Sequence, residues 1–416
     1  MKKQQLNVVA FVVLAPLSLC LAQAKPQAKL QGQAKTAAQK LTPQQKFVLD
    51  VVQTAVALPQ GDQQDRLRVL TSAANVIGPV RPALAKKFAK EGMRIEQELI
   101  SAGETPSVSI LEAGHVDCAE AQAFVENVPV EKVGVAEQSL IAAQAMCPKQ
   151  ATEPVRRKVE AGLEQGSLAP RALLSIIEAI GSKTPWAQQE FVKFFSSLPS
   201  SAEELRKDAP NFAAMYDRMA PDVDKDAAKT AGIKMLLWLG KMKEGGARNL
   251  ALNIVTGSMK TVLGEKAYDE ALATDVMAKQ VADNAGQPGD AERPEEESVS
   301  VLQAMNQSGV DRIPELQKMA PSLRAREAAA SGFASGTSGD RKLAGRYFDL
   351  AFSSLDDVWS SRSERADAPA VVEEVSEAAA QVDAVDALKR AQRLQDSSAS
   401  AIGMIAVARV VAGQQQ

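Results

Sequence analysis

The chain has 416 residues, with 48 lysines and arginines against 51 aspartates and glutamates, and 45% of its residues are hydrophobic. This near balance of charge, without a basic cluster, argues against a nucleic acid as partner. Aromatic residues make up only 4% of the chain, and His115 is its one histidine. The composition therefore disfavours an aromatic-lined carbohydrate cleft and most histidine-dependent catalytic or metal sites.

The N-terminal segment has the three parts of a secretory signal peptide. Two lysines precede an apolar run over Leu6–Leu21, and the small-x-small sequence Ala22-Gln23-Ala24 follows. Such a segment directs export and is then removed. We predict that residues 1–24 are the signal peptide, with cleavage between Ala24 and Lys25.

Two other interpretations of this segment are less favourable. An uncleaved anchor needs roughly 20 apolar residues, and this run is short and contains Pro16. A lipoprotein signal requires a small residue before the lipidated cysteine, whereas Leu19 precedes Cys20. We therefore expect a periplasmic or extracellular protein with no transmembrane segment after cleavage.

After a polar tether at residues 25–41, the helical patterns begin. Thr42, Pro43 and Gln45 supply an N-cap, a proline in the first turn and a capping-box partner. Apolar pairs one turn apart then mark an amphipathic helix: Phe47/Val48, Val51/Val52 and Ala55/Val56.

The same kind of pattern recurs along the chain. Asp62 begins a second helix with an apolar face at Leu67, Leu70, Ala73, Ala74 and Ile77, and Gly78-Pro79 ends it. Ser201, with a glutamate three residues later, begins another helix with a capping box. Further helices are predicted at 81–101, 118–127, 131–147, 152–164, 169–180, 185–197, 201–219 and 222–242. No run of β-branched residues alternates long enough to indicate a sheet, so we predict an all-α array of antiparallel helical hairpins.

Two segments define the predicted division of this array. The apolar stretch 233–242 is too short to span a membrane, so we expect a buried core helix there. Residues 285–298 are rich in proline, glycine and acid, which indicates a solvated linker. We expect a helical-hairpin array at 42–284, this linker, and a C-terminal helical region at 299–416.

One stretch of the C-terminal region resembles a tetratricopeptide repeat. Gly332 lies in its first helix, a Gly339-Asp340 turn follows, and Ala344, Phe348 and Ala351 share one face of the next helix. The similarity covers residues 328–359, a single copy, and Ser331 and Ser335 stand where the family has a leucine and an aromatic residue. The resemblance implies an α-solenoid, or superhelix, that presents a groove to a peptide or protein.

The sequence around His115 allows three interpretations. A zinc site could use His115, Asp117, Cys118 and Cys147, but structural zinc sites place their cysteines in close pairs. A reactive thiol is favoured only by the position of Cys118 in the first turn of a helix. Asp117 and a glutamate three residues later form a capping box, so a helix is expected to begin at Cys118.

The third interpretation is a disulfide. Pro148 ends the following helix at Cys147. An antiparallel hairpin brings both cysteines to the same end, and an exported protein meets oxidising conditions. We therefore predict a Cys118–Cys147 disulfide, no metal site, and no catalytic role for His115.

Acidic clusters provide no clear catalytic pair. Asp356-Asp357, Glu373-Glu374 and Glu295–Glu297 are interpreted as solvated faces. Trp359 and Arg362 follow the first of these pairs and form a hypothetical recognition edge on the repeat-like hairpin.

The functional hypothesis is an exported, non-enzymatic helical-repeat scaffold without a cofactor, which binds a protein or peptide. The chain lacks a G-x-S-x-G turn, an H-E-x-x-H helix, a phosphate-binding loop and a dinucleotide fingerprint. The alternative is an all-helical hydrolase or polysaccharide-cleaving enzyme whose two carboxylates come from distant helices. A self-assembling array with no other ligand is a third possibility.

Overall fold

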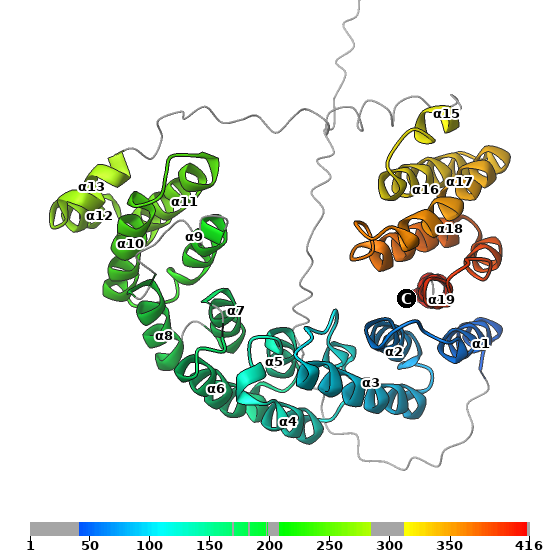
Figure 1. Ribbon diagram of the computed structural model, residues 1–416, viewed down its shortest axis with the longest axis horizontal. Coiled ribbons are helices and arrows are strands. Elements are labelled where there is room, and N and C mark those ends of the chain that lie inside the picture. The colour runs from blue at the N-terminus through cyan, green and yellow to red at the C-terminus, as the bar shows by residue number, and fades with distance from the viewer. Residues whose placement is uncertain are drawn as a thin grey trace, which may run out of the picture. The chain divides into compact units, whose positions relative to one another are not determined.

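The described part of the chain is built from helices alone. The computed structural model describes residues 41–168, 170–181, 184–196, 198, 208–283 and 312–413. These residues form α-helices and two short 3-10 helices, with no β-strand among them, which confirms the predicted all-α class (Figure 1).

The elements up to residue 164 are α1 (Pro43–Ala57), α2 (Gln63–Ile77), α3 (Pro82–Ala102), η1 (Ile110–Ala113), α4 (Cys118–Asn127), η2 (Val130–Lys132), α5 (Glu137–Met146) and α6 (Pro148–Glu164). Those up to residue 283 are α7 (Pro170–Ile180), α8 (Pro185–Ser196), α9 (Ala209–Met219), α10 (Lys225–Gly240), α11 (Gly246–Leu263), α12 (Glu265–Ala273) and α13 (Val276–Asp283). The C-terminal helices are α15 (Ile313–Leu316), α16 (Pro321–Thr337), α17 (Arg341–Ser360), α18 (Ala368–Ala391) and α19 (Ser397–Gly413).

Local capping signals set the helix starts. The Thr42 hydroxyl accepts a hydrogen bond from the Gln45 N–H at 3.1 Å, and the Gln45 side chain accepts one from the Thr42 N–H at 3.0 Å. This is the predicted capping box of α1, and Asp62 caps α2 in the predicted place. The predicted cap at Ser201 and the cleavage positions Ala24 and Lys25 lie outside the described residues.

The predicted inner faces of the helices form the core. The buried side chains of α1 and α2 include Val48, Val51, Val52, Ala55, Leu67, Leu70, Ala73, Ala74 and Ile77. In α10, Met235, Leu236 and Leu239 are fully buried, so the apolar stretch 233–242 does supply a core helix. No helix among the described residues is both long and apolar enough to cross a lipid bilayer.

Helices α4 and α5 form a hairpin closed by a disulfide. Asp117 caps α4 with both halves of a capping box, and α5 ends at Cys147. The Cys118 and Cys147 sulfur atoms are bonded, with 5.5 Å between the Cα atoms. The predicted disulfide is confirmed, and both thiols are occupied by it. His115 is half-buried against the end of α2, where a Cβ added to Gly78 would lie only 2.1 Å from the imidazole.

The predicted continuous helix at 131–147 is wrong. A 3-10 turn at η2 is separated from α5 by residues 133–136. At Gly134 the backbone passes so close to the Ser167 carbonyl oxygen that a Cβ would lie 2.5 Å from it. The Ser167 hydroxyl also donates to the Val130 carbonyl at 2.7 Å. These contacts hold the segment in a turn instead of a helix.

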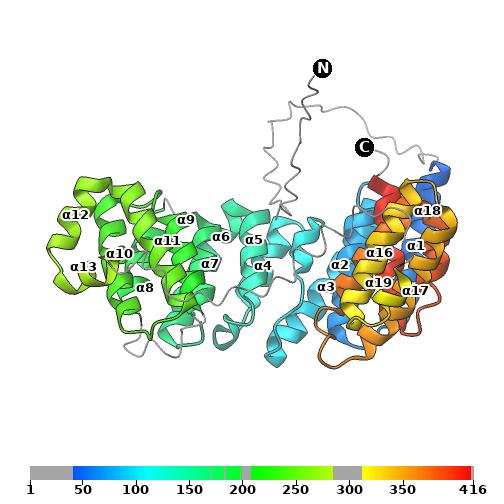
Figure 2. The ribbon, with the colours of Figure 1, turned by 90° about the horizontal axis from the view of Figure 1, so that it is seen from above.

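The C-terminal helices pack onto the N-terminal ones. Helix α19 contacts α18 on one side and α1 and α2 on the other, as both ribbon views show (Figures 1 and 2). The described residues after Leu41 belong to one compact unit. The predicted linker at 285–298 lies outside the described residues, but the helices after it are not separate from those at the start of the chain.

Candidate functional site

The hairpin of α16 and α17 is packed closely through a glycine. A Cβ added to Gly332 would lie 2.9 Å from the ring of Phe348, so only glycine lets the two helices approach this far. Phe348, Ala344 and Ala351 are all buried. Gly339, with φ of 95°, makes the turn, and the Asp340 side chain caps α17. The residues that carried the repeat resemblance therefore meet in space.

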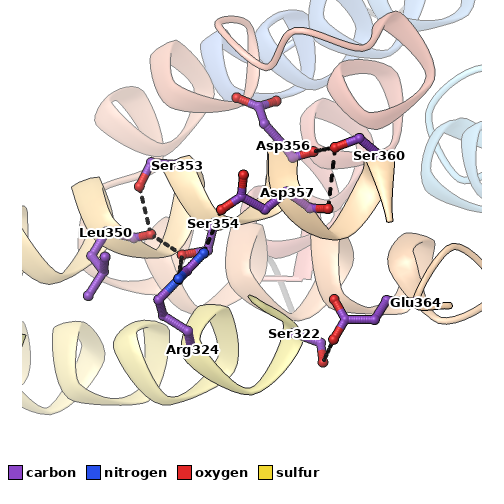
Figure 3. Close-up of polar contacts among 9 residues, drawn as sticks. All are labelled: Ser322, Arg324, Leu350, Ser353, Ser354, Asp356, Asp357, Ser360 and Glu364. Atoms are coloured by element: carbon purple, nitrogen blue, oxygen red, sulfur yellow. Dashed lines mark hydrogen bonds and ion pairs between the residues drawn. The ribbon is translucent and has the colours of Figure 1, made fainter. Parts of the chain in front are cut away.

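A polar cluster fixes α16 against one side of α17. Arg324 donates to the Ser354 hydroxyl at 2.8 Å and forms an ion pair with Asp357 at 2.5 Å (Figure 3). Ser354 in turn donates to the Leu350 carbonyl at 2.7 Å. Figure 3 shows the Asp356 carboxylate directed away from Arg324, and it accepts from the Gln395 N–H at 3.0 Å. The two neighbouring aspartates thus serve opposite sides of α17.

Helix α18 bends at Asp383. Asp383 has non-helical angles, with φ of −154° and ψ of 101°. Its carboxylate accepts from the N–H groups of Val385 and Asp386, both at 3.0 Å. It therefore acts as an N-cap inside the helix, because it satisfies amides that the bend would leave without a partner.

A groove runs between α17 and the second half of α18. It consists of two cavities of about 280 and 450 Å³ that share Asp386 and Lys389. The first, which we call the mixed cavity, has both apolar and charged residues in its lining: Arg341, Ala344, Gly345, Phe348, Ala379, Val382, Asp383, Val385, Asp386 and Lys389. The second is mostly polar and is lined by Asp349, Phe352, Ser353, Asp356, Asp386, Lys389, Arg390, Arg393 and Leu394. We call these two cavities together the α17–α18 groove.

Arg390 lies at the centre of the groove and holds two of its carboxylates. It forms ion pairs with Asp349 on α17 and, at 2.7 Å, with Asp386 on its own helix. Burial disfavours the charged guanidinium, but the hydrogen bonds and charges of Asp386 and Asp349 outweigh it and raise the pKa of Arg390. Arg390 stays charged, and the two aspartates are held in fixed positions.

The groove carries four acidic and four basic residues. All four acids form hydrogen bonds or ion pairs, whereas only one of the four basic residues does so among the described residues. Asp349 and Asp386 pair with Arg390, while Asp356 and Asp383 accept from backbone amides. The other three basic residues are exposed and have no side-chain hydrogen bond or ion pair within the described part of the chain: Arg341, Lys389 and Arg393. The groove therefore presents unpaired positive charge although its formal charges balance.

The predicted recognition edge is wrong for Trp359. Its side chain is only 8% exposed, and the Arg365 guanidinium covers the ring at 3.9 Å from the ring centre. Arg362 is exposed but lies outside the groove. An aromatic residue after two aspartates is as typical of a core position as of a surface one, which is why the sequence misled.

Two predicted solvated acidic pairs are instead bound to partners. Asp356 and Asp357 are engaged as described above, and Glu373 and Glu374 form ion pairs with Arg409 and Arg326. Glu295–Glu297 lie outside the described residues. No group of three or more possible metal ligands is found in the part of the chain that the structure describes.

A second depression lies between α6 and α8. It has a volume of about 610 Å³, with Leu173 and Phe194 in its lining and Glu160, Glu164 and Glu190 at its sides. Glu190 is paired with Lys193 at 2.6 Å. Residues 197 and 199–207, which directly follow α8, are outside the described residues, so we base the candidate site on the α17–α18 groove.

Comparisons with other proteins identify no family for the chain. No protein-family model matches the sequence, and neither the curated proteins nor the solved structures include a match to it. We therefore infer the function from the geometry of the groove.

Proposed function

We propose that this protein is an exported, non-enzymatic helical scaffold that binds a segment of a partner polypeptide in the α17–α18 groove. The observation that carries the proposal is the groove itself, which combines a mixed cavity with exposed apolar side chains, a polar cavity and fixed charges along α17. Peptide-binding sites commonly combine apolar pockets with a few oriented polar groups in this way.

The repeat-like hairpin supports this proposal. Close packing of Phe348 on Gly332, together with the capped turn at Asp340, gives α16 and α17 the small-residue contact on which tetratricopeptide-like hairpins depend. We extend the proposal to the architecture: the helices form a diverged α-solenoid in which this hairpin is one unit.

Export is supported by the sequence and agrees with the disulfide. Residues 1–24 have the composition of a signal peptide, and a buried structural disulfide is typical of an oxidising compartment. Fractionation of the producing cell and N-terminal sequencing test this part. The expected result is a mature chain that begins at Lys25 outside the cytoplasm, and a full-length cytoplasmic chain would contradict it.

The enzymatic alternative has less support in this groove. Acid–base hydrolysis needs two carboxylates free to exchange protons with a substrate. Here Asp349 and Asp386 are held by Arg390, and Asp356 and Asp383 are bound to backbone amides. This arrangement favours a binding groove over a hydrolytic centre.

Site-specific photo-crosslinking tests the proposed function. A photoreactive amino acid replaces Ser353, which lines the groove and is exposed, or Lys342, which is exposed on α17 outside the groove. We expect polypeptide adducts from position 353 in the exported fraction and few from position 342. Adducts of equal yield at both positions, or none at 353, would contradict the proposal.

A further inference from the structure

We infer that the segment bound in the α17–α18 groove is an acidic peptide with a large apolar side chain beside its carboxylates. This inference rests on the proposed function, because it specifies the chemistry of the partner for the same groove. It depends on which charges in the groove are already paired and on which apolar side chains the mixed cavity exposes.

Three basic side chains of the groove are available to a ligand. Lys389 lies on the second half of α18, and Arg393 follows four positions later in the turn after the helix, so both line the polar cavity. Arg341 lies at the start of α17 and lines the mixed cavity. None of the three has an acidic partner among the described residues. Carboxylates of a ligand would find charge partners at both ends of the groove.

The four acidic side chains of the groove already have partners. A basic ligand would need Asp349 or Asp386, but Arg390 already holds both. Releasing either would leave the half-buried guanidinium without its partner, which is costly. Asp383 caps the second half of α18, and Asp356 accepts from the Gln395 amide in the connection between α18 and α19. An acidic ligand disturbs none of these contacts, so charge complementarity favours it.

The mixed cavity also presents apolar side chains to a ligand. The first cavity is lined by Phe348, Ala379 and Val382, and Val385 at its edge is 57% exposed, one of the few large apolar side chains in the described chain that is so open. A cavity of about 280 Å³ accommodates one large side chain. Because Arg341 and Lys389 border this cavity, the apolar anchor and the acidic residues are expected to be close in the ligand sequence.

Fluorescence anisotropy with three labelled peptides of equal length tests the inference on the mature chain. The first peptide carries one phenylalanine and four glutamates, the second has glutamines in place of the glutamates, and the third has lysines. A short single-stranded oligonucleotide serves as a polyanion of another class. The titrations are repeated on a chain with Glu295, Glu296 and Glu297 changed to glutamine, so that acids of the chain itself do not compete.

The decisive variant is Lys389→Ala with Arg393→Ala. Lys342→Ala with Arg362→Ala is the matched control, because it removes the same charge from exposed residues outside the groove. We expect the acidic peptide to bind most tightly, with affinity reduced roughly tenfold, or about 1.4 kcal/mol, in the groove variant, because two exposed ion pairs to the ligand are lost. The control should bind within about twofold of wild type. Far-ultraviolet circular dichroism checks that both variants keep their helices.

The possible failures are distinguishable. Equal binding of all three peptides, insensitive to the groove variant but accompanied by crosslinking at position 353, would overturn the acidic preference and leave the proposed scaffold function standing. Tighter binding of the oligonucleotide than of the acidic peptide would also overturn the inference. If no peptide binds and position 353 gives no adduct, the proposed function fails as well.

Discussion

Two parts of this molecule hold distant positions together in different ways. The α4–α5 hairpin is closed by a disulfide between cysteines 29 positions apart. The contacts of α19 with α1 and α2, which we call the terminal closure, join residues more than 300 positions apart, as Gly61 and Ser398 do at 2.9 Å. The hairpin is covalent and local, whereas the closure is made of packing and hydrogen bonds and includes both ends of the compact unit.

The terminal closure has an apolar centre and a polar edge. Ile405, Val407 and Ala408 in α19 are completely buried. At the edge, the Gln44 side chain donates to the Val411 carbonyl at 2.6 Å, and Arg365 pairs with Asp65 at 2.8 Å. Because helices from both ends of the chain contribute to one core, loss of the closure exposes apolar surface on both. The disulfide, by contrast, constrains a single hairpin.

The largest effect is expected from a charge in the closure. Ile405→Asp places a carboxylate in a fully buried position of α19, which should lower the free energy of unfolding by about 4 kcal/mol or more. Urea unfolding followed by circular dichroism measures it. Gln392→Asp, at an exposed position just after α18, is the control and should have almost no effect. Equal stability of the two variants would show that the closure contributes little.

The disulfide should have a slightly smaller and more local effect. Removing it by Cys118→Ser with Cys147→Ser frees a loop of about 30 residues, which on the chain-entropy model lowers the free energy of unfolding by about 3.5 kcal/mol. Hydrogen exchange should accelerate in α4 and α5 and stay slow in α19. Faster exchange throughout α19 at the same time would mean that the hairpin and the closure unfold together.

The different predictability of the two parts has a physical reason. Asp117, Cys118 and Pro148 lie within one hairpin, so capping, pairing and helix termination could be derived from neighbouring residues. Asp65 and Arg365 are separated by 300 positions, and no local pattern relates them. The one available signal was α19 itself, because its apolar residues occupy all faces, as in a helix that is buried on every side.

The candidate groove could likewise be predicted from the sequence only where its contacts are local. The glycine and phenylalanine of the α16–α17 hairpin could be identified because their spacing is local. Arg341 and Lys389 come from different helices, and their lack of partners depends on the pairing of Arg390 with Asp349. In the sequence, Asp383 does not differ from an ordinary aspartate within a helix, so the bend there could not be predicted. Unpaired charge is therefore a property of the folded arrangement, which the order of residues does not reveal.

Glu96 on α3 is hydrogen-bonded to α5 of the disulfide-closed hairpin, and we expect it to make stability depend on pH. It is fully buried on α3 and accepts from the Ile110 N–H at 2.9 Å and from the Ser139 hydroxyl of α5 at 2.6 Å. Burial raises its pKa from 4.5 to about 7, although these hydrogen bonds oppose the shift. Between these two pH values the folded chain holds a proton that the unfolded chain has lost. The free energy of unfolding should therefore fall by about 3 kcal/mol as pH rises from 4.5 to 7, and then level off.

Urea unfolding at pH 5 and pH 8 checks this effect. Glu96→Gln, which stays neutral, should flatten the dependence, whereas Glu98→Gln on the exposed side of α3 should retain it. An unchanged pH dependence in Glu96→Gln would exclude Glu96 as its source. Hydrogen exchange at both pH values would then show whether the ionised group loosens the hairpin, the closure or both.

The smallest effect is expected at the polar edge of the closure. Arg365 forms an ion pair with Asp65, which is only 6% exposed, and stacks on Trp359. Burial raises the pKa of Asp65, and the hydrogen bond with Ser398 and the charge of Arg365 oppose that rise. Arg365→Ala leaves this aspartate without its cation and uncovers the indole. Because Arg365 is partly exposed and Ser398 remains, the loss should be about 2 kcal/mol, less than for a fully buried pair.

A double-mutant cycle with Asp65→Asn separates the ion pair from the stacking. If the pair carries most of the effect, Arg365→Ala should cost little once Asp65 is neutral; if the stacking on Trp359 dominates, the cost should be the same in both backgrounds. Trp359 fluorescence provides the second readout, because its ring becomes accessible to a quencher only when Arg365 is removed or the edge opens. Unchanged stability in Arg365→Ala would contradict the expected loss.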